Sequence, residues 1–329
     1  MPAPCPAVLL NPLSGRVRRR PEAVRALARR ICGDRYAEAS EPAAIAAAVA
    51  AFDLGESDLL CVVAGDGTLH AALTALERLR PHGPWPILAA APGGTTNMAA
   101  RDLGAAGRLL PWLAALSGWG AQADTQGAAG SGGRGHLVTR PVLRIAIPGA
   151  HSLVGLILGA GTVSAGVDFF NRRLRPFGIP EVVGSPIALA RTLLIMALGG
   201  RGMDRMAPTM TVRVEGGPEL DGPALLLGVS TLHRVVIGAR PFWGTGGGPI
   251  RLTLVERNAK AIFRSVPRFI LGRPGDRLTP ERGWHSLNAA RIEVAFGGPF
   301  IVDGEVYHAR AADGPMEITA AREVRWWTP

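Results

Sequence analysis

The chain has 329 residues, of which 47% are hydrophobic and 19% are charged, and its formal net charge is +10 at pH 7. This hydrophobic content can bury enough apolar surface to offset the entropy of ordering the chain, which excludes an intrinsically disordered protein. The length favours two domains, because a domain typically has about 100–200 residues. Three cysteines, none of them in a C-x-x-C pair, argue against a disulfide framework and a cysteine-based zinc site, and they favour a cytoplasmic protein.

The positive charge has two competing explanations. Lys260 is the only lysine among the 36 basic residues, so a compositional bias toward arginine would explain the excess without any function. A functional role would favour anionic partners such as phosphates, nucleic acid or an anionic membrane surface. Nucleic acid is the weaker candidate, because aromatic residues make up only 5% of the chain and no basic stretch is interleaved with them.

Neither a signal peptide nor a membrane-spanning helix is expected. The first residues lack the basic region and apolar run of a signal peptide. The longest apolar stretches, at 153–163 and 187–198, fall short of the roughly 20 residues that a spanning helix needs.

Strands and helices alternate over the first 120 residues. Pro21 suits a first helical position and Gly33 suits the end of that helix. The alternation predicts a doubly wound, Rossmann-like α/β domain, with a parallel sheet that carries helices on both faces. Strands are expected at 7–10, 59–63 and 87–90, and helices at 21–32, 42–52, after Thr68 and after Asn97.

Residues 117–135 are rich in Gly, Ala and Ser and predict a linker. The secondary structure that the sequence predicts changes after this segment. Short β-rich segments separated by Gly, Pro and Asp then predict an antiparallel, sandwich-like domain. These segments lie at 142–147, 153–158, 210–214, 224–230, 250–255, 290–296 and 300–302, and helical candidates lie at 186–198 and 259–271. The expected division is an α/β domain at 1–125, a linker at 126–136 and a β-rich domain at 137–329, whose C-terminal tail packs back on the first domain.

Three glycine-containing turns follow the three predicted strands, at 11–15, 65–68 and 93–97. Ligands of doubly wound sheets bind at the carboxyl ends of the strands. Glycine lets the backbone approach a phosphate closely, and free amides at a helix N-terminus bind anions. Thr68 and Thr95 can add hydroxyl donors or serve as helix caps. Three such turns in register favour a phosphate site over ordinary turn chemistry.

A carboxylate in one of these turns, Asp66, would repel phosphate unless a cation lay between them, so it predicts Mg²⁺. Other phosphate motifs do not fit the chain. A Walker A loop needs Gly-Lys, but Lys260 follows Ala259, and His233-Arg234-Val235 is not the protein-kinase catalytic triplet.

Four blocks of the chain resemble the diacylglycerol kinase catalytic-domain family of lipid kinases, which includes bacterial diacylglycerol kinases, YegS-like kinases and sphingosine kinases. Asn11-Pro12-Leu13-Ser14-Gly15 is similar to N-P-x-S-G, and Ala64-Gly65-Asp66-Gly67-Thr68 is similar to G-G-D-G-T with Ala for the first Gly. Pro92-Gly93-Gly94-Thr95-Thr96-Asn97 is similar to P-x-G-T-x-N, and Ala100-Arg101 follows it as the family's A-R. Far downstream, Asp303-Gly304-Glu305 is similar to D-G-E.

The resemblance implies an ATP-dependent kinase that transfers the γ-phosphoryl group to a hydroxyl of a membrane lipid such as diacylglycerol or a sphingoid base. The first domain would hold ATP and Mg²⁺, the second would hold the lipid, and a cleft would lie between them. Asp66 would bind the metal through the phosphates, and Asp303 or Glu305 would take the proton from the lipid hydroxyl. Taken alone, Asp303-Gly304 after an apolar strand also fits a hairpin turn. The implied nucleotide contacts are Asn11, Pro12, Ser14, Gly15, Gly65, Asp66, Gly67, Thr68, Gly94, Thr95 and Asn97.

Some positions depart from the family pattern. His70 and Ala71 replace Asn-Glu, and Met98 stands where many members have Asp. Sphingosine-kinase-like members also have an apolar residue at that position. The arginine-rich region 170–186 puts the family's structural Mg²⁺ site in the second domain in doubt. Two alternatives stay open: a soluble-substrate kinase resembling NAD kinases, against which the D-G-E block counts, and a catalytically inactive nucleotide-binding regulator.

A lipid substrate implies peripheral association with the inner face of the membrane and no nucleic-acid partner, while a homodimer is left open. His70, Cys61 and the pair Trp326-Trp327 are expected to be packing residues. An ordinary core helix with solvated arginines is the alternative to a membrane-docking face around 172–205. The residues of that face would be Arg172, Arg173, Arg175, the apolar helix 186–198, Arg201 and Arg205.

Overall fold

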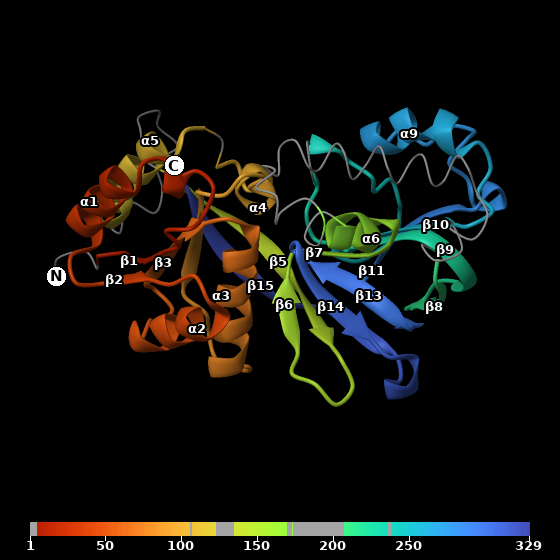
Figure 1. Ribbon diagram of the computed structural model, residues 1–329, viewed down its shortest axis with the longest axis horizontal. Coiled ribbons are helices and arrows are strands. Elements are labelled where there is room, and N and C mark those ends of the chain that lie inside the picture. The colour runs from red at the N-terminus through yellow and green to blue at the C-terminus, as the bar shows by residue number, and fades with distance from the viewer. Residues whose placement is uncertain (1–4, 106, 123–134, 170–172, 174–206, 236–237) are drawn as a thin grey trace. The chain divides into compact units, whose positions relative to one another are not determined.

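The computed structural model describes residues 5–105, 107–122, 135–169, 173, 207–235 and 238–329 (Figure 1). The chain divides into two compact units, Met1–Arg140 with Glu323–Pro329, and Pro141–Arg322. The predicted helix at 186–198 lies outside the described residues, and so does the predicted docking face except for Arg173, which is exposed. None of the described helices is long and apolar enough to cross a bilayer.

The first unit contains the predicted parallel sheet. Its strands run in the order β2-β1-β3-β4, and every neighbouring pair is parallel. All residues of β1, β3 and β4 are buried, as continuous apolar runs with helices on both faces require. The strands are β1 (Ala7–Leu10), β2 (Tyr36–Glu38), β3 (Leu59–Ala64) and β4 (Ile87–Pro92).

Helices cover both faces of this sheet. Figure 1 shows α1 and α5 together on one side and α2 and α3 together on the other. In α1 the side chains of Val24, Ala28 and Cys32 are buried at helical spacing, and Gly33 ends the helix with a positive φ of 58°. The elements are η1 (Val17–Arg19), α1 (Pro21–Cys32), α2 (Pro42–Ala51), α3 (Asp66–Leu79), α4 (Met98–Asp102), α5 (Leu109–Ala115) and η2 (Leu116–Gln122).

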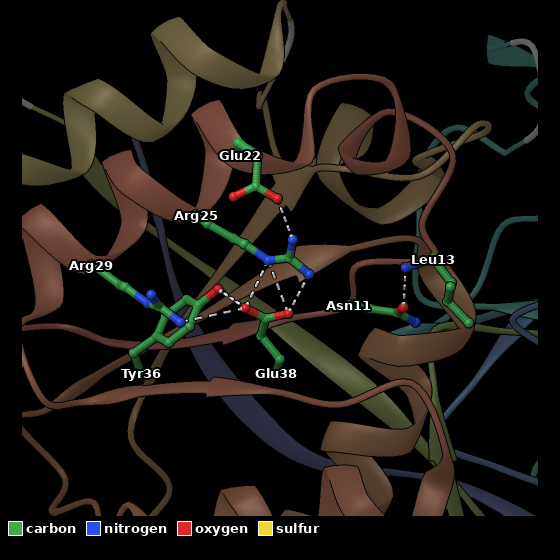
Figure 2. Close-up of polar contacts among 7 residues, drawn as sticks. All are labelled: Asn11, Leu13, Glu22, Arg25, Arg29, Tyr36 and Glu38. Carbon is green, nitrogen blue, oxygen red and sulfur yellow. Dashed lines mark hydrogen bonds and ion pairs between the residues drawn. The ribbon is translucent and has the colours of Figure 1, made fainter.

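A charged cluster ties the edge strand β2 to α1 (Figure 2). Glu38 accepts hydrogen bonds from Arg25 through Nε, at 3.0 and 3.2 Å, and through Nη2 at 2.9 Å, and one from the Tyr36 hydroxyl at 2.7 Å. Arg25 also donates to Glu22 at 2.7 Å, within the helix. The hydrogen bonds from Arg25 lower the pKa of Glu38. The three-residue strand β2 is thereby fixed by side chains as well as by its pairing with β1.

The end of β15 (Met316–Thr328) belongs to the first unit and lies beside β4, with Trp326 paired to Leu88 in parallel. Trp326 is fully buried, and the Trp327 ring lies edge-on to Trp112 at 5.8 Å. The prediction that both tryptophans are packing residues is confirmed. Cys61 and His70 are buried as well, in β3 and α3.

The second unit is rich in antiparallel strands. Residues 219–223 of β9 pair with β8, and residues 224–230 pair with β7 and β10, so this long strand joins two groups of strands around one apolar core. The strands are β5 (His136–Ala146), which begins in the first unit, β6 (Leu153–Gly155), β7 (Ile157–Gly161), β8 (Thr209–Val214), β9 (Glu219–Ser230), β10 (Ile250–Glu256), β11 (Trp284–Ala289), β12 (Arg291–Phe296), β13 (Gly298–Val302) and β14 (Glu305–Ala309). The helices are α6 (Thr162–Phe169), α9 (Ile262–Leu271), η6 (Pro280–Arg282) and η7 (Ala311–Asp313).

The mixed fold class is as predicted, with a parallel first part and an antiparallel second part. Several elements were not predicted from the sequence: β2, α5, α6, β11, β14 and β15. The segment predicted as one strand at 153–158 belongs to two strands, β6 and β7. They are separate because the backbone amide of Leu156 donates a hydrogen bond to the carboxylate of Asp303 and not to a neighbouring strand.

Candidate functional site

The strand order of the first unit places the three glycine turns at one edge of the sheet. From β1 the chain continues to β2 on one side, whereas β3 lies on the other side of β1. Loops that leave neighbouring strands in opposite directions open a crevice at this switch point, where ligands of doubly wound folds bind. The turns after β1 and β3 flank that point, and the turn after β4 is next to them.

Asn11 links the first turn to the second. Its Nδ2 donates to Thr68 Oγ1 at 2.8 Å. Its Oδ1 accepts from the Leu13 amide at 2.9 Å (Figure 2). Both Asn11 and Thr68 are less than 10% exposed. The structure therefore uses these two predicted nucleotide contacts to hold the turns together, and their contact with a ligand stays a prediction.

Further bonds join the first turn to its two neighbours. The Gly65 amide donates to Ser14 Oγ at 3.3 Å, and the Arg16 amide donates to the Gly93 carbonyl at 2.8 Å. A Cβ atom on Gly15 would lie 2.5 Å from Thr95 Oγ1. A side chain on Gly15 would therefore require the Thr95 hydroxyl to move.

The second and third turns touch backbone to backbone. A Cβ on Gly94 would lie 2.4 Å from Gly65 Cα, far inside van der Waals contact. Asn97, in the left-handed region at φ 51°, accepts from the Gly94 amide at 2.7 Å and donates to the Gly94 carbonyl at 2.8 Å. Gly65 and Gly94 therefore allow two loops to pack that side chains would force apart.

Asp66 opens α3 and also caps α4. Its two carboxylate oxygens accept the amides of Met98 at 3.0 Å and Ala99 at 3.1 Å, the first residues of α4. The first intrahelical bond of α3 runs from the Leu69 amide to the Gly65 carbonyl. The amides of Gly67 and Thr68 precede that bond, and such amides at a helix N-terminus attract an anion.

Two arginines that were not among the predicted site residues add positive charge beside the turns. Arg16 directly follows the first turn, and Arg101 lies in α4. Burial lowers the pKa of Arg16, and the positive charges of Arg101 and Arg19 lower it further. An arginine stays charged despite such a shift, so these neighbours concentrate positive potential where an anionic ligand would bind. The sequence could have indicated both as site residues, because Arg16 follows a glycine turn and Arg101 belongs to the A-R pair.

The donor set of these turns fits a magnesium ion held mainly by a ligand. Asp66 is the only carboxylate in the three turns. Within the described ranges no group of three His, Cys, Asp or Glu side chains is placed to hold a metal. Mg²⁺ usually keeps several waters and takes one or two carboxylates plus substrate phosphates, so a single aspartate is compatible with it.

The predicted catalytic carboxylates lie in the second unit, on the hairpin of β13 and β14. Val302 pairs with Glu305, and the two residues between them have φ of 49° for Asp303 and 93° for Gly304. Two left-handed residues in a two-residue loop make a type I′ turn. The hairpin expected for Asp303-Gly304 is therefore present.

Asp303 is buried, and backbone amides hold its carboxylate in place. Leu156 donates to Oδ2 at 3.0 Å, and Ile157 donates to Oδ1 at 3.1 Å. A Cβ on Gly155 would lie 2.5 Å from Asp303 Oδ2, so glycine is required there to admit the carboxylate. Glu305, by contrast, is exposed. Of the two predicted bases, Asp303 is the one with a fixed orientation.

Comparison with known proteins identifies the first part of the chain. Residues 6–125 match the family model of the diacylglycerol kinase catalytic domain. This segment contains all three glycine turns. A search of curated proteins returned no match.

Solved structures align over nearly the whole chain. A structure of a diacylglycerol kinase from Bacillus anthracis str. Sterne aligns with a TM-score of 0.57 and 14% identity, covering 100% of this chain and 98% of that one. A provisionally assigned diacylglycerol kinase from the same organism aligns with a TM-score of 0.62 and 15% identity, over 100% and 98%. At such low identity these matches show the fold alone.

An NAD kinase from Archaeoglobus fulgidus in complex with ATP aligns with a TM-score of only 0.46 and 13% identity, over 97% of this chain and 92% of that one. That score is too low to support an assignment. The family match and the fold together confirm the predicted resemblance and the two-part α/β and β-rich architecture. The chain is a kinase, a phosphotransferase with an alcohol group as acceptor.

Proposed function

Because residues 6–125 match the family model of the diacylglycerol kinase catalytic domain, we propose that this protein is an ATP-dependent kinase whose acceptor is the hydroxyl of a membrane lipid, such as diacylglycerol or a sphingoid base. The observation that carries the proposal is the convergence of three glycine turns on the first turn of α3. Such a substrate implies action at the inner, cytoplasmic face of a membrane.

The first unit supplies the groups that a nucleotide needs. The amides of Gly67 and Thr68 at the start of α3 bind phosphate oxygens, and Arg16 and Arg101 add positive charge. Ser14, Gly15 and Thr95 are half-buried, so they remain accessible to a ligand. When bound, Mg²⁺ neutralises charge on the phosphates, and Asp66 is the residue that would hold it.

The second unit supplies the base. The acceptor oxygen attacks the γ-phosphorus, the bond from that phosphorus to the β,γ-bridging oxygen breaks, and ADP leaves. The hydroxyl proton passes to a carboxylate, from which water later removes it. We assign this role to Asp303 rather than Glu305, because the two amides fix its carboxylate before the substrate arrives.

The test is to incubate the protein with γ-labelled ATP, Mg²⁺ and a total lipid extract, and to separate the organic from the aqueous phase. The proposal expects label in an organic-phase product. Label in a water-soluble product would support the soluble-substrate alternative instead. No transfer at all would leave a nucleotide-binding regulator and overturn the proposal.

A further inference from the structure

Helix α9 of the second unit turns an apolar surface to solvent. Phe263, Ile270 and Leu271 are 49%, 45% and 57% exposed, and they are half of the six large hydrophobic side chains that stand exposed in the described part of the chain. Pro267 is exposed as well. Because Phe263, Pro267 and Ile270 are four and three residues apart, they lie on one face of the helix. Leu271 extends that face at the end of the helix.

The opposite face holds α9 firmly to its unit. The Phe269 ring packs against Trp243 at 6.1 Å and Trp284 at 5.9 Å between centroids. The Arg240 amide donates to the Ile270 carbonyl at 2.8 Å, and Gly272 ends the helix in the left-handed region at φ 64°. The exposure of the outer face is therefore not a sign of a poorly packed helix.

Positive charge surrounds the apolar face. Residues 257–282 contain seven Arg or Lys and two Asp or Glu, a net charge of +5. Lys260, Arg264 and Arg273 are exposed around the helix. A short amphipathic element with apolar side chains and flanking cations suits the boundary between anionic headgroups and acyl chains.

We propose that α9 docks this protein on an anionic lipid bilayer, with Phe263, Ile270 and Leu271 entering the headgroup region and the surrounding cations contacting lipid phosphates. This inference rests on the proposed lipid substrate, which has to be reached at a membrane. It places the docking surface on α9, a different segment from the one that the sequence alone suggested.

The first test measures co-sedimentation with phosphatidylcholine vesicles that contain or lack phosphatidylglycerol, without ATP or acceptor lipid. Wild type should bind only the anionic vesicles, and less at high salt because screening weakens the cationic contacts. Phe263→Ser/Ile270→Ser/Leu271→Ser should lose at least about tenfold of that binding, since the three apolar side chains that enter the headgroup region are removed. The matched control is Leu79→Ser, because Leu79 is also 49% exposed but lies in the first unit.

The single lysine gives a second, independent readout. Lys260 is exposed and lies two residues before α9. Acetylation of its amine, followed by mass spectrometry, should slow in the presence of phosphatidylglycerol vesicles and not in the presence of phosphatidylcholine alone. Equal acetylation rates in both, or equal sedimentation of the triple variant and wild type, would overturn the docking surface.

The outcomes separate this inference from the proposed function. A wild type that binds vesicles through α9 but phosphorylates no lipid refutes the proposed function and leaves the docking surface standing. A wild type that phosphorylates a short-chain dispersed acceptor but ignores anionic vesicles overturns the docking surface alone. Sedimentation velocity supplies a last check, because a dimer that the triple substitution splits, with vesicle binding unchanged, would make α9 a self-association surface instead.

Discussion

Gly94 has no room for a side chain, since the atom facing it is the backbone Cα of Gly65. We expect Gly94→Ala to separate the second and third turns, to lower the free energy of unfolding by about 1–3 kcal/mol, as overpacking does, and to weaken ATP binding. Calorimetric titration with ATP and denaturant unfolding measure the two effects.

The matched control is Gly118→Ala, because a Cβ there meets nothing within 4 Å. It should leave both quantities unchanged. Wild-type ATP affinity in Gly94→Ala would show that the packing of these turns does not form the nucleotide site.

Asp58 shows how a paired carboxylate makes stability depend on pH. It accepts a hydrogen bond from Arg35 at 2.9 Å and one from the Gly55 amide at 2.6 Å. The bond from Arg35 is the main cause that lowers the pKa of Asp58. A lowered folded-state pKa gives stabilisation that is present above the unfolded-state pKa of about 3.9 and is lost as the pH falls through the folded-state value.

In Arg35→Met, the free energy of unfolding should therefore fall less between neutral pH and pH 3 than it does in wild type. The difference should be less than about 1 kcal/mol, because the pair is partly exposed. Unfolding free energies of wild type and variant across that range provide the measurement. Arg30→Met, at an exposed position of α1, should keep the wild-type profile. An unchanged slope in Arg35→Met would show that the pair does not contribute.

Among the elements, the C-terminal strand β15 ends beside β4 in the first unit. Trp326 is fully buried beside β4, more than 200 residues away in the chain. Trp326→Ala should cost about 3–5 kcal/mol, the usual range for removing a buried tryptophan. Circular dichroism in denaturant measures the loss. Glu323→Ala, at an exposed position of the same strand, should behave as wild type, and an equal cost in both variants would contradict the account.

The elements that the sequence predicted are those with a local signal. Continuous apolar runs identify β1, β3 and β4, and proline and glycine mark the ends of α1. The elements it missed depend on partners far along the chain. The three residues of β2 are too few to show the alternation of apolar and polar residues that is typical of a strand. The break between β6 and β7 at Leu156 exists because the Leu156 amide donates a hydrogen bond to the Asp303 carboxylate.

The site was predictable to the same extent. Glycine spacing indicated the three turns, but not that Asn11 bonds Thr68 or that Asp66 caps α4, since those contacts cross from one turn to another.

We assign the nucleotide to the first unit of the molecule and the base to the second. ATP should therefore bind whether or not the base is intact. Asp303→Asn keeps one acceptor oxygen for the amides of Leu156 and Ile157 but cannot take a proton. Glu305→Gln changes an exposed carboxylate of the same hairpin and should retain activity.

The decisive measurement is phosphoryl transfer from labelled ATP to lipid, made beside ATP affinity on the same samples. We expect Asp303→Asn to bind ATP with the wild-type affinity. Its phosphoryl transfer to lipid should fall by a factor of about 10²–10⁴, as expected on loss of a general base. Undiminished transfer in Asp303→Asn would contradict the assignment of the base, and a wild type that binds no ATP would contradict the assignment of the three turns.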